Sequence, residues 1–438
     1  MHSDSLPGAN RATTEWSSTV DPVSELHSVV IVGSSLAGLR AAETLRTDAF
    51  AGRITIVGAE DREPYDRPPL SKKLLSGEWE PERISLRKPD DLASLNIEWK
   101  LGSPAMSLDL DGRTLTLANG EAVSFDGLII ATGSAARRLP NQPTWHGIHV
   151  LRTMDDALAL RAAIEPSADR PSPRLVVIGA GFIGLEVAAT ARLRGCSVTV
   201  LEGAEAPMMR GLGTEMGHAA SLVHGDNGVD MRLGVSIVGF FESSKDRIGG
   251  VELSTGERID ADAVVVGVGA APVTSWLEGS GLELRDGVVC DQFLNAGSPL
   301  VYAAGDVCRW TNDLYGREMR VEHWTTASEQ GAAAARNLLA EASGEERAAY
   351  SAVPFFWSDQ FTARIQFLGR AEGDENVHVV VGSPEERSFV ALYERAGVLV
   401  AALGVSRPRQ LMPFRALIAS RVSIEEALDF AASLNAPS

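Results

Sequence analysis

The residues best suited to chemistry in this chain form two glycine-rich loops, each placed directly after an apolar run. The first loop is GSSLAG at 33–38 and the second is GAGFIG at 179–184. In a strand–loop–helix unit, the backbone N–H groups of such a loop and the positive end of the helix bind a pyrophosphate. The first glycine allows a tight turn, the second lets the phosphate approach, and the third lets helix and strand pack. Two such loops predict two bound dinucleotides, an arrangement suited to passing a hydride from a nicotinamide to a flavin.

The second loop carries all three glycines of this pattern. Gly179, Gly181 and Gly184 lie between an apolar run and a helix-like segment. That context makes the loop a strong signal for a bound nucleotide. Glu202 ends the next apolar run, where a carboxylate accepts hydrogen bonds from the ribose hydroxyls of NADH and repels the 2′-phosphate of NADPH. Arg210 stands close enough in sequence to offer a phosphate contact, so NADH is favoured over NADPH without being fixed.

The first loop departs from the pattern at one position. Gly33 and Gly38 occupy the first and third glycine positions, but Ser35 stands at the second. A serine is small, and its hydroxyl can donate a hydrogen bond to a phosphate. Glu60 follows the next apolar run and suits the ribose hydroxyls of a nucleotide. Taken alone, this imperfect loop is weak evidence for a nucleotide site.

Two further signals fit a flavin at the first loop. Asp306 follows Gly305 and the apolar run 301–304, where a carboxylate can hold the ribityl hydroxyls of a flavin. The segment TASE at 326–329 is typical of a capping box and predicts the start of an alanine-rich helix over 327–340. The N-terminus of such a helix would face the flavin pyrimidine and stabilise negative charge on it.

Two strand–helix–strand units are needed to position these residues. The predicted segments are 27–32, 36–46 and 53–58 in the first unit, and 175–178, 183–194 and 197–201 in the second. Two apolar runs, 125–132 and 261–270, are predicted to lead the chain out of these units. Beyond Tyr350 the pattern changes to short alternating strands, at 377–381, 389–393 and 398–403, followed by a pair of helices. The sequence therefore predicts an α/β fold with two Rossmann-like dinucleotide-binding domains and a C-terminal α+β domain.

Composition and charge disfavour several classes of protein. The 438 residues suffice for two or three domains, and the formal net charge of −18 argues against nonspecific nucleic-acid binding. No apolar run approaches the roughly 20 residues of a membrane span. Cys196, Cys290 and Cys308 are far apart in sequence, so neither a redox CxxC pair nor a metal site is predicted. Residues 1–26 are polar and lack a secretory or transit signal, which indicates a disordered extension on a cytoplasmic protein with reduced thiols.

With these residues placed, the chain resembles the FAD-dependent, NADH-linked ferredoxin reductases of the putidaredoxin and rubredoxin reductase family, which serve bacterial oxygenases and cytochromes P450. The resemblance runs from about His27 to about Leu428. Its most specific segments are PYDRPPLSK at 64–72, LRT at 151–153, GD at 305–306, EHW at 322–324 and PFFWSDQ at 354–360. The tyrosine that often follows the last segment is replaced here by Phe361.

The resemblance implies the glutathione reductase fold, in which an FAD domain is split by an NAD domain and followed by an interface domain. The implied boundaries are 27–138 and 271–347 for the FAD-binding domain, 139–270 for the NAD-binding domain, and 348–438 for the C-terminal reductase domain.

The resemblance also implies roles for individual residues. Lys72 and Glu186 would form an ion pair beside the flavin N5, where the nicotinamide arrives. Ala37 would offer its backbone to the pyrophosphate, Ala105 its backbone to the adenine, and Trp357 would lie near the flavin. The remaining residues of the FAD site would be Arg67, Arg152, Asp306 and Trp324.

The implied activity is hydride transfer from NADH to FAD, followed by transfer of single electrons to a ferredoxin. The expected partner carries a [2Fe–2S] cluster and feeds a cytochrome P450 or oxygenase, and the reductase would be a monomer or weak homodimer that binds neither nucleic acid nor membrane. Two alternatives stay open: an NADH oxidase or a disulfide or peroxide reductase of the same fold, and a non-enzymatic flavin-bound signalling protein. The first alternative commonly requires a redox cysteine beside the flavin, and none is suitably placed here.

An acidic ferredoxin would need a basic surface on a chain that is itself acidic. Two groups of basic residues are candidates for this surface. These two docking clusters are Arg407, Arg409, Arg415 and Arg421, and Lys72, Lys73, Arg83, Arg87 and Lys88. The alternative is that they are ordinary surface charges.

Overall fold

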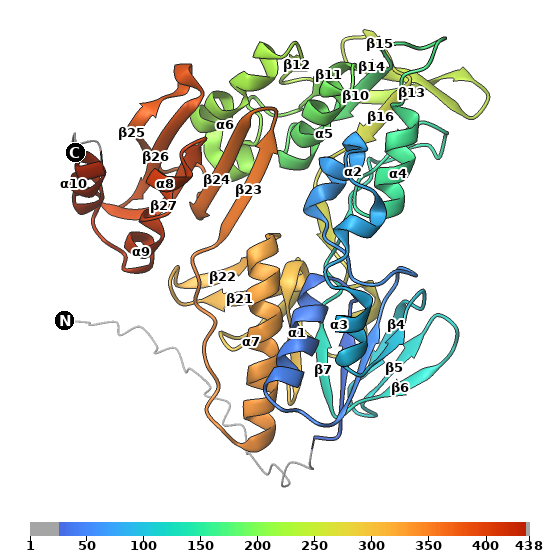
Figure 1. The fold of residues 1–438 in the computed structure, drawn as a ribbon, viewed down its shortest axis with the longest axis vertical. Coiled ribbons are helices and arrows are strands. Elements are labelled where there is room, and N and C mark those ends of the chain that lie inside the picture. Colours follow the sequence, from blue (N-terminus) through green and yellow to red (C-terminus); the bar gives the residue numbers. More distant parts are fainter. Residues whose placement is uncertain (1–25, 435–438) are drawn as a thin grey trace, which may run out of the picture.

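The computed structural model describes residues 26–434, which form two α/β units and a C-terminal sheet domain. Figure 1 shows the first unit below, the second unit above it, and the C-terminal sheet beside the second unit. The predicted extension at 1–26 lies outside the described residues, apart from Leu26. The sheet of one α/β unit is parallel and that of the other is parallel except at one edge strand, which confirms the predicted α/β class with two Rossmann-like cores.

The first unit is built on a six-stranded sheet with β1 at its centre. In spatial order the strands are β19 (Asn295–Ser298), β20 (Val301–Ala303), β7 (Gly127–Ile130), β1 (Ser28–Val32), β2 (Arg53–Val57) and β3 (Ile97–Lys100). Strand β1 pairs in parallel with β2 and β7, and β20 pairs in parallel with β7. Because β20 lies far along the chain, the chain leaves this unit after β7 and returns later to complete the sheet.

Two helices of the first unit pack closely against each other. They are α1 (Leu36–Thr47) and α7 (Trp324–Ser343). A Cβ on Gly331 would lie 2.3 Å from the backbone oxygen of Ala37, so this approach requires glycine at 331. The unit also holds the short helix α3 (Pro89–Ser94) and two small sheets, whereas the short helix α2 (Lys73–Ser76) packs against the second unit and shares its apolar core. The strands of those sheets are β4 (Ala105–Asp109), β5 (Thr114–Leu117) and β6 (Ala122–Ser124), and β18 (Val288–Cys290), β21 (Cys308–Asn312) and β22 (Arg317–Arg320).

The second unit repeats the same design with a five-stranded parallel sheet. Its strands in spatial order are β12 (Asp230–Arg232), β11 (Ser197–Leu201), β10 (Arg174–Ile178), β16 (Ala263–Val266) and β9 (Ile148–His149). Its helices are α4 (Met154–Ala163), α5 (Phe182–Leu193) and α6 (Met209–Asp226), and an antiparallel sheet is added by β13 (Ile237–Ser244), β14 (Arg247–Leu253) and β15 (Arg258–Asp260).

The two crossings between the units lie side by side. The predicted exit strand 125–132 is followed by β8 (Ser134–Ala136), and the run 261–270 ends where β17 (Ala270–Pro272) begins. These two strands pair with each other in an antiparallel arrangement. The exit and the return of the chain are therefore held together, while the domain boundaries given above stay predictions.

The C-terminal domain is a five-stranded antiparallel sheet with three helices. The strands are β23 (Phe355–Gln360), β24 (Ala363–Gly369), β27 (Val398–Val405), β26 (Ser388–Arg395) and β25 (Asn376–Ser383), and the helices are α8 (Pro408–Leu411), α9 (Phe414–Ala419) and α10 (Ile424–Leu434). The three predicted strands fall within β25, β26 and β27, but β23 and β24 were not predicted. One continuous apolar cluster includes Leu185 of α5, Phe367 of β24 and Tyr393 of β26, so the C-terminal sheet shares its core with the second unit.

Helix α7 begins earlier than the sequence predicts. Its N-cap residue is His323, so Thr326 lies in the first turn and is buried rather than acting as a cap. The predicted capping box at 326–329 is therefore wrong. The start of the helix is set by tertiary contact, because the Trp324 indole N–H donates to Asp66 at 2.7 Å.

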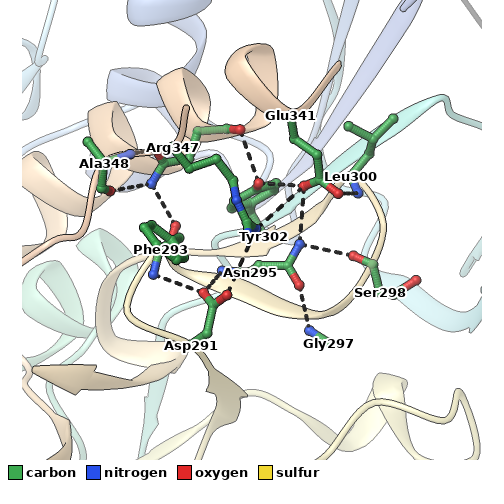
Figure 2. Close-up of polar contacts among 11 residues, drawn as sticks. Asp291, Phe293, Asn295, Gly297, Ser298, Leu300, Tyr302, Glu341, Arg347 and Ala348 are labelled. Carbon is green, nitrogen blue, oxygen red and sulfur yellow. Dashed lines mark hydrogen bonds and ion pairs between the residues drawn. The ribbon is translucent and has the colours of Figure 1, made fainter. Parts of the chain in front are cut away.

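The far end of α7 is fixed to β19 and β20 by the polar cluster in Figure 2. Glu341 accepts hydrogen bonds from the Tyr302 hydroxyl at 2.5 Å and from the Leu300 N–H and the Asn295 amide, both at 3.3 Å. Arg347 lies 3.9 Å from the same carboxylate. Burial raises the pKa of Tyr302, so its hydroxyl stays protonated and donating. The helix that opens beside the first loop is thus anchored at its opposite end.

Candidate functional site

The first glycine loop requires its first and third glycines. Gly33 has φ +127°, and a Cβ there would lie 2.0 Å from the backbone oxygen of Ala131. A Cβ on Gly38 would lie 1.9 Å from the backbone oxygen of Gly33. Ser35 is the N-cap residue of α1, yet its side chain makes no capping hydrogen bond to the described helix. The N–H groups of the first turn therefore remain available to an anion.

Arg67 ties the first loop to several other segments. Its Nε donates to the Ser35 hydroxyl at 3.3 Å, its Nη1 to the backbone oxygen of Arg152 at 2.6 Å, and its Nη2 to Glu60 at 2.6 Å. The Tyr65 hydroxyl donates to the other carboxylate oxygen of Glu60 at 2.5 Å, and burial raises the pKa of Tyr65 to about 12. The structure thus brings Ser35, Arg67 and Arg152 together. Glu60, the residue expected to accept hydrogen bonds from the ribose, already accepts them from Arg67 and Tyr65.

Asp306 lies where the first loop meets α7. Its carboxylate accepts hydrogen bonds from the Ser134 hydroxyl at 2.9 Å and from Arg152 Nη2 at 3.0 Å. A Cβ on the neighbouring Gly305 would lie 3.2 Å from the Cβ of Ala37, so the two predicted segments are in contact. Three residues expected in the FAD site, Asp306, Arg152 and Ala37, therefore converge.

The N-terminus of α7 supplies aromatic rings and unpaired polar nitrogens beside this point. The Trp324 and Trp357 ring centroids lie 6.1 Å apart. His323 is half-buried with its Nδ1 enclosed, and loss of solvation lowers the pKa of its ring to about 4, so the imidazole is neutral near pH 7. Within the described chain, His323 Nδ1 and Gln330 Nε2 are buried without a hydrogen-bond partner, and α7 has no side-chain cap. Uncapped helix ends and orphaned nitrogens fit a large polar cofactor at this place.

Lys72 and Glu186 join the two nucleotide units. Lys72 Nζ, directly after the 3₁₀ turn Pro68–Ser71, lies 2.8 Å from Oε2 of Glu186 on α5. The Ser71 hydroxyl donates to the same oxygen at 2.5 Å. Glu186 is only 5% exposed, so its negative charge depends on these donors.

Two residues of the C-terminal domain extend this network and were not predicted: Ser358 contacts the carboxylate, and Gln360 contacts Ser358. Ser358 Oγ lies 2.7 Å from Glu186 Oε1, and Gln360 Nε2 donates to Ser358 Oγ at 3.1 Å. Gln360 Oε1 in turn lies 2.8 Å from His224 Nε2. Both belong to the segment PFFWSDQ, of which only Trp357 had been assigned a place. Alternation along a strand puts residues 358 and 360 on one face, but no signal in the sequence ties that face to Glu186.

In the second loop, the first and third glycines leave no room for a side chain, whereas the middle glycine does. Gly179 has φ +100°, and a Cβ there would lie 2.4 Å from the backbone oxygen of Gly267. A Cβ on Gly184 would lie 2.2 Å from the backbone oxygen of Gly179. A Cβ on Gly181 would meet nothing within 4 Å in the described chain. Since Gly181 is also the N-cap of α5, the helix presents its N–H groups across open space.

Glu202, directly after β11, is hydrogen-bonded to the second loop. Its two carboxylate oxygens accept hydrogen bonds from the backbone N–H groups of Ala180 at 2.7 Å and Ala204 at 2.9 Å. The acid therefore lies against the loop itself, in the position from which it would face a bound ribose. Arg210 is in the first turn of α6.

The remaining predicted residues lie away from this centre. Ala105 begins β4, which Figure 1 shows at the side of the first unit, far from α5. Cys196, Cys290 and Cys308 are all buried and unpaired as disulfides. Across residues 26–434, no three potential ligands are grouped as a metal site, and no helix has the length and apolar character to cross a membrane.

Comparison with known proteins supports this geometry over most of the chain. Residues 27–331 match the family described as pyridine nucleotide-disulphide oxidoreductase, and residues 355–436 match that described as reductase C-terminal. Rhodocoxin reductase from Rhodococcus erythropolis is 36% identical over 92% of each chain, and putidaredoxin reductase from Pseudomonas putida is 33% identical over 91% of this chain and 93% of its own. The crystal structure of a covalent putidaredoxin reductase–putidaredoxin complex aligns with a TM-score of 0.86 at 32% identity, covering 93% of this chain and 98% of that one.

Proposed function

The chain belongs to the pyridine nucleotide-disulphide oxidoreductase family, and we propose that it acts as an NADH-dependent ferredoxin reductase. The cofactors of such a protein are FAD and NAD(H), and the two loops with their uncapped helices fit them. The observation that carries the proposal is the buried Lys72–Glu186 pair, because it links the FAD-type unit to the helix that opens the NAD-type unit.

Bound FAD would supply the acceptor for the NADH hydride and the donor of single electrons. The chain itself binds and orients the two nucleotides through the N-termini of α1 and α5. Lys72 and Glu186 place opposite charges where the units meet. Phe356 packs on Phe182 at 4.6 Å and on His323 at 4.8 Å, so aromatic rings from three elements help to exclude water from this place.

The same proposal includes a preference for NADH. Glu202 holds a negative charge at the end of β11, beside the second loop. That charge accepts hydrogen bonds from the adenosine ribose and repels a 2′-phosphate.

For the electron acceptor we propose a [2Fe–2S] ferredoxin that supplies a cytochrome P450 or oxygenase. The relatives support a ferredoxin acceptor and an oxygenase, since they include the ferredoxin–NAD(+) reductase component of a p-cumate 2,3-dioxygenase system and a putidaredoxin reductase joined to putidaredoxin. We further propose that the reductase works in the cytoplasm as a monomer or weak homodimer.

The two predicted docking clusters are partly neutralised within the chain. Four of their members already face carboxylates, in the pairs Lys72–Glu186, Lys73–Glu78, Arg87–Glu43 and Arg415–Glu329. We propose that attraction for an acidic ferredoxin comes mainly from Arg83, Lys88, Arg407, Arg409 and Arg421. Ferredoxin reduction should then slow as salt is added, and a rate independent of ionic strength would contradict this docking.

The deciding experiment uses the purified full chain supplied with FAD. We expect a flavin absorption spectrum that bleaches when NADH is added without oxygen, and cytochrome c reduction that requires both NADH and a [2Fe–2S] ferredoxin. A chain that stays colourless with FAD, or that bleaches but reduces no ferredoxin in a panel, would overturn the proposal. The alternative of a disulfide or peroxide reductase is disfavoured by the burial of all three cysteines, and thiol alkylation should leave turnover unchanged.

A further inference from the structure

Strand β23 connects the C-terminal domain to the charged pair between the nucleotide units. It contacts both α5 and α7, and Figure 1 shows it in the C-terminal sheet, beside the second unit. Successive side chains of a strand point to opposite faces, so residues 356, 358 and 360 share one face. On this face the Phe356 ring packs on Phe182, the first residue of α5, at 4.6 Å. The same face therefore reaches the helix that carries Glu186.

The hydrogen bonds along this face have a defined direction. Gln360 Oε1 is an amide oxygen that can only accept, so the His224 ring donates to it from Nε2 at 2.8 Å. The amide of Gln360 then donates from Nε2 to Ser358 Oγ at 3.1 Å. A hydroxyl has one proton, and with its oxygen already accepting, Ser358 is set to donate to Glu186 Oε1 at 2.7 Å.

The two oxygens of Glu186 are thus held by two different parts of the chain. Oε2 receives Ser71 and Lys72 from the first unit, at 2.5 Å and 2.8 Å. Oε1 receives Ser358 from the C-terminal domain. Loss of the Ser358 donor would leave a buried carboxylate oxygen unpaired, and the side chain would turn to regain a partner. Lys72 Nζ also donates to the backbone oxygen of Pro68 at 3.1 Å, so a carboxylate that turned would lengthen or break the ion pair.

We propose that Ser358, oriented by Gln360, is a positioning residue that fixes the Lys72–Glu186 pair for hydride transfer. This inference rests on the proposed reductase function and adds to it a role for the C-terminal domain. Ser358 touches neither nucleotide loop in this arrangement. It acts through Glu186. The position of the C-terminal sheet against α5 therefore determines where the Lys72–Glu186 pair lies between the two nucleotides.

The test is Ser358→Ala in the full FAD-loaded protein, followed by anaerobic stopped-flow reduction with NADH. We expect the limiting rate of flavin bleaching to fall roughly tenfold, while the apparent dissociation constant for NADH changes less than about twofold. Gln360→Met keeps the side-chain volume but removes the donor to Ser358, and it should give a smaller loss, roughly threefold. The flavin content and melting temperature of each variant show whether it is folded and loaded.

Tyr393→Phe is the matched control. The Tyr393 hydroxyl donates to the Leu212 backbone oxygen at 2.8 Å, so it also links the C-terminal sheet to the second unit, but it does not contact Glu186. This variant should bleach at the wild-type rate. If Ser358→Ala is as fast as wild type, or if Tyr393→Phe is equally slow, the positioning role is refuted while the reductase function stands. A wild-type protein that does not bleach with NADH would instead overturn the function itself.

Discussion

The two glycine loops share one topology but differ in what supports them. Each follows the central part of a parallel sheet, opens a helix, and has an acid at the end of the next strand. In the first loop, Arg67 donates to both Ser35 and Glu60. In the second, Gly181 faces open space and Glu202 accepts from backbone N–H groups. The first loop is therefore braced by side chains from other segments, whereas the second is self-contained.

This difference suits two different residence times. A site that is ordered before its ligand arrives loses less entropy on binding, which favours long retention. A site that exchanges its ligand at every turnover needs an open entrance. We therefore expect the first loop to retain FAD through purification and the second to bind NADH more weakly and release it.

The largest effect should come from adding a side chain to the first glycine of either loop. Gly33→Ala puts a Cβ 2.0 Å from the Ala131 backbone oxygen. At a φ of +127° the substitution should cost more than about 3 kcal/mol and abolish FAD retention. Gly179→Ala should weaken NADH binding and leave the flavin in place. Flavin content and NADH titration measure both, and the opposite pattern would reverse the assignment of the loops.

Removing Lys72 should slow electron transfer from NADH to FAD while both nucleotides still bind. Lys72→Ala leaves the buried Glu186 without its ammonium partner, and loss of such a charged contact slows flavin reduction by roughly 10- to 100-fold. FAD content should not change. Lys73→Ala is the control, because the neighbouring lysine pairs with exposed Glu78 instead. Stopped-flow bleaching at the wild-type rate in Lys72→Ala would rule out the role of the pair.

Acid should lower the stability of the folded protein through protonation of His323. Burial lowers the pKa of this histidine from 6.5 to about 4, so the unfolded chain binds its proton first. The free energy of unfolding should therefore fall as the pH drops from 6.5 towards 4, by on the order of 1–2 kcal/mol by pH 5. Urea midpoints at pH 7 and pH 5 measure this loss. His323→Asn should show a smaller drop, and an equal drop in both proteins would assign the effect to other groups.

Glu202→Ala should act on the second loop alone. It removes the acceptor for the N–H groups of Ala180 and Ala204 and the charge that disfavours a 2′-phosphate. We expect NADH to bind roughly tenfold more weakly, with NADPH gaining relative to NADH. Titration with both nucleotides, alongside a flavin spectrum, gives the comparison. Loss of FAD in this variant would show that the two sites are not independent.

The smallest effects should come from exchanging the middle residues of the loops. In Ser35→Gly, Arg67 keeps its bonds to Glu60 and Arg152, so FAD affinity should change by less than about threefold. Gly181→Ser has room for its Cβ and should fold normally, but its side chain occupies the path of the phosphate and should weaken NADH severalfold. A large FAD loss in Ser35→Gly would mean that the hydroxyl itself holds the cofactor.

The sequence predicted what depends on near neighbours. The glycine spacing at 33–38 and 179–184 and the adjoining strands are local patterns, and the structure contains them. The roles of Ser358 and Gln360 were not predicted, because their partners Glu186 and His224 lie 172 and 136 residues away in the sequence. No periodicity links segments so distant, and β23 itself was not predicted.

The start of α7 also shows that local sequence signals are limited, because here a local signal predicted the wrong residue. The segment 326–329 has the composition of a cap, but the helix starts at Trp324, whose indole bonds to Asp66 at a separation of 258 residues. A local signal was present, and a distant contact overrode it. The contact between Ser35 and Arg67 was likewise out of reach, because side-chain direction in an irregular loop follows no period.

The pairing of Val301 in β20 with Leu128 in β7 has a consequence for biosynthesis. A ribosome delivers the NAD-type unit as one continuous stretch before β20 emerges, so that unit can fold on the nascent chain. The FAD-type sheet must wait for a strand made much later, and closing so long a loop carries an entropic cost. We therefore expect stable FAD binding only after residues 301–303 of β20 have been synthesised.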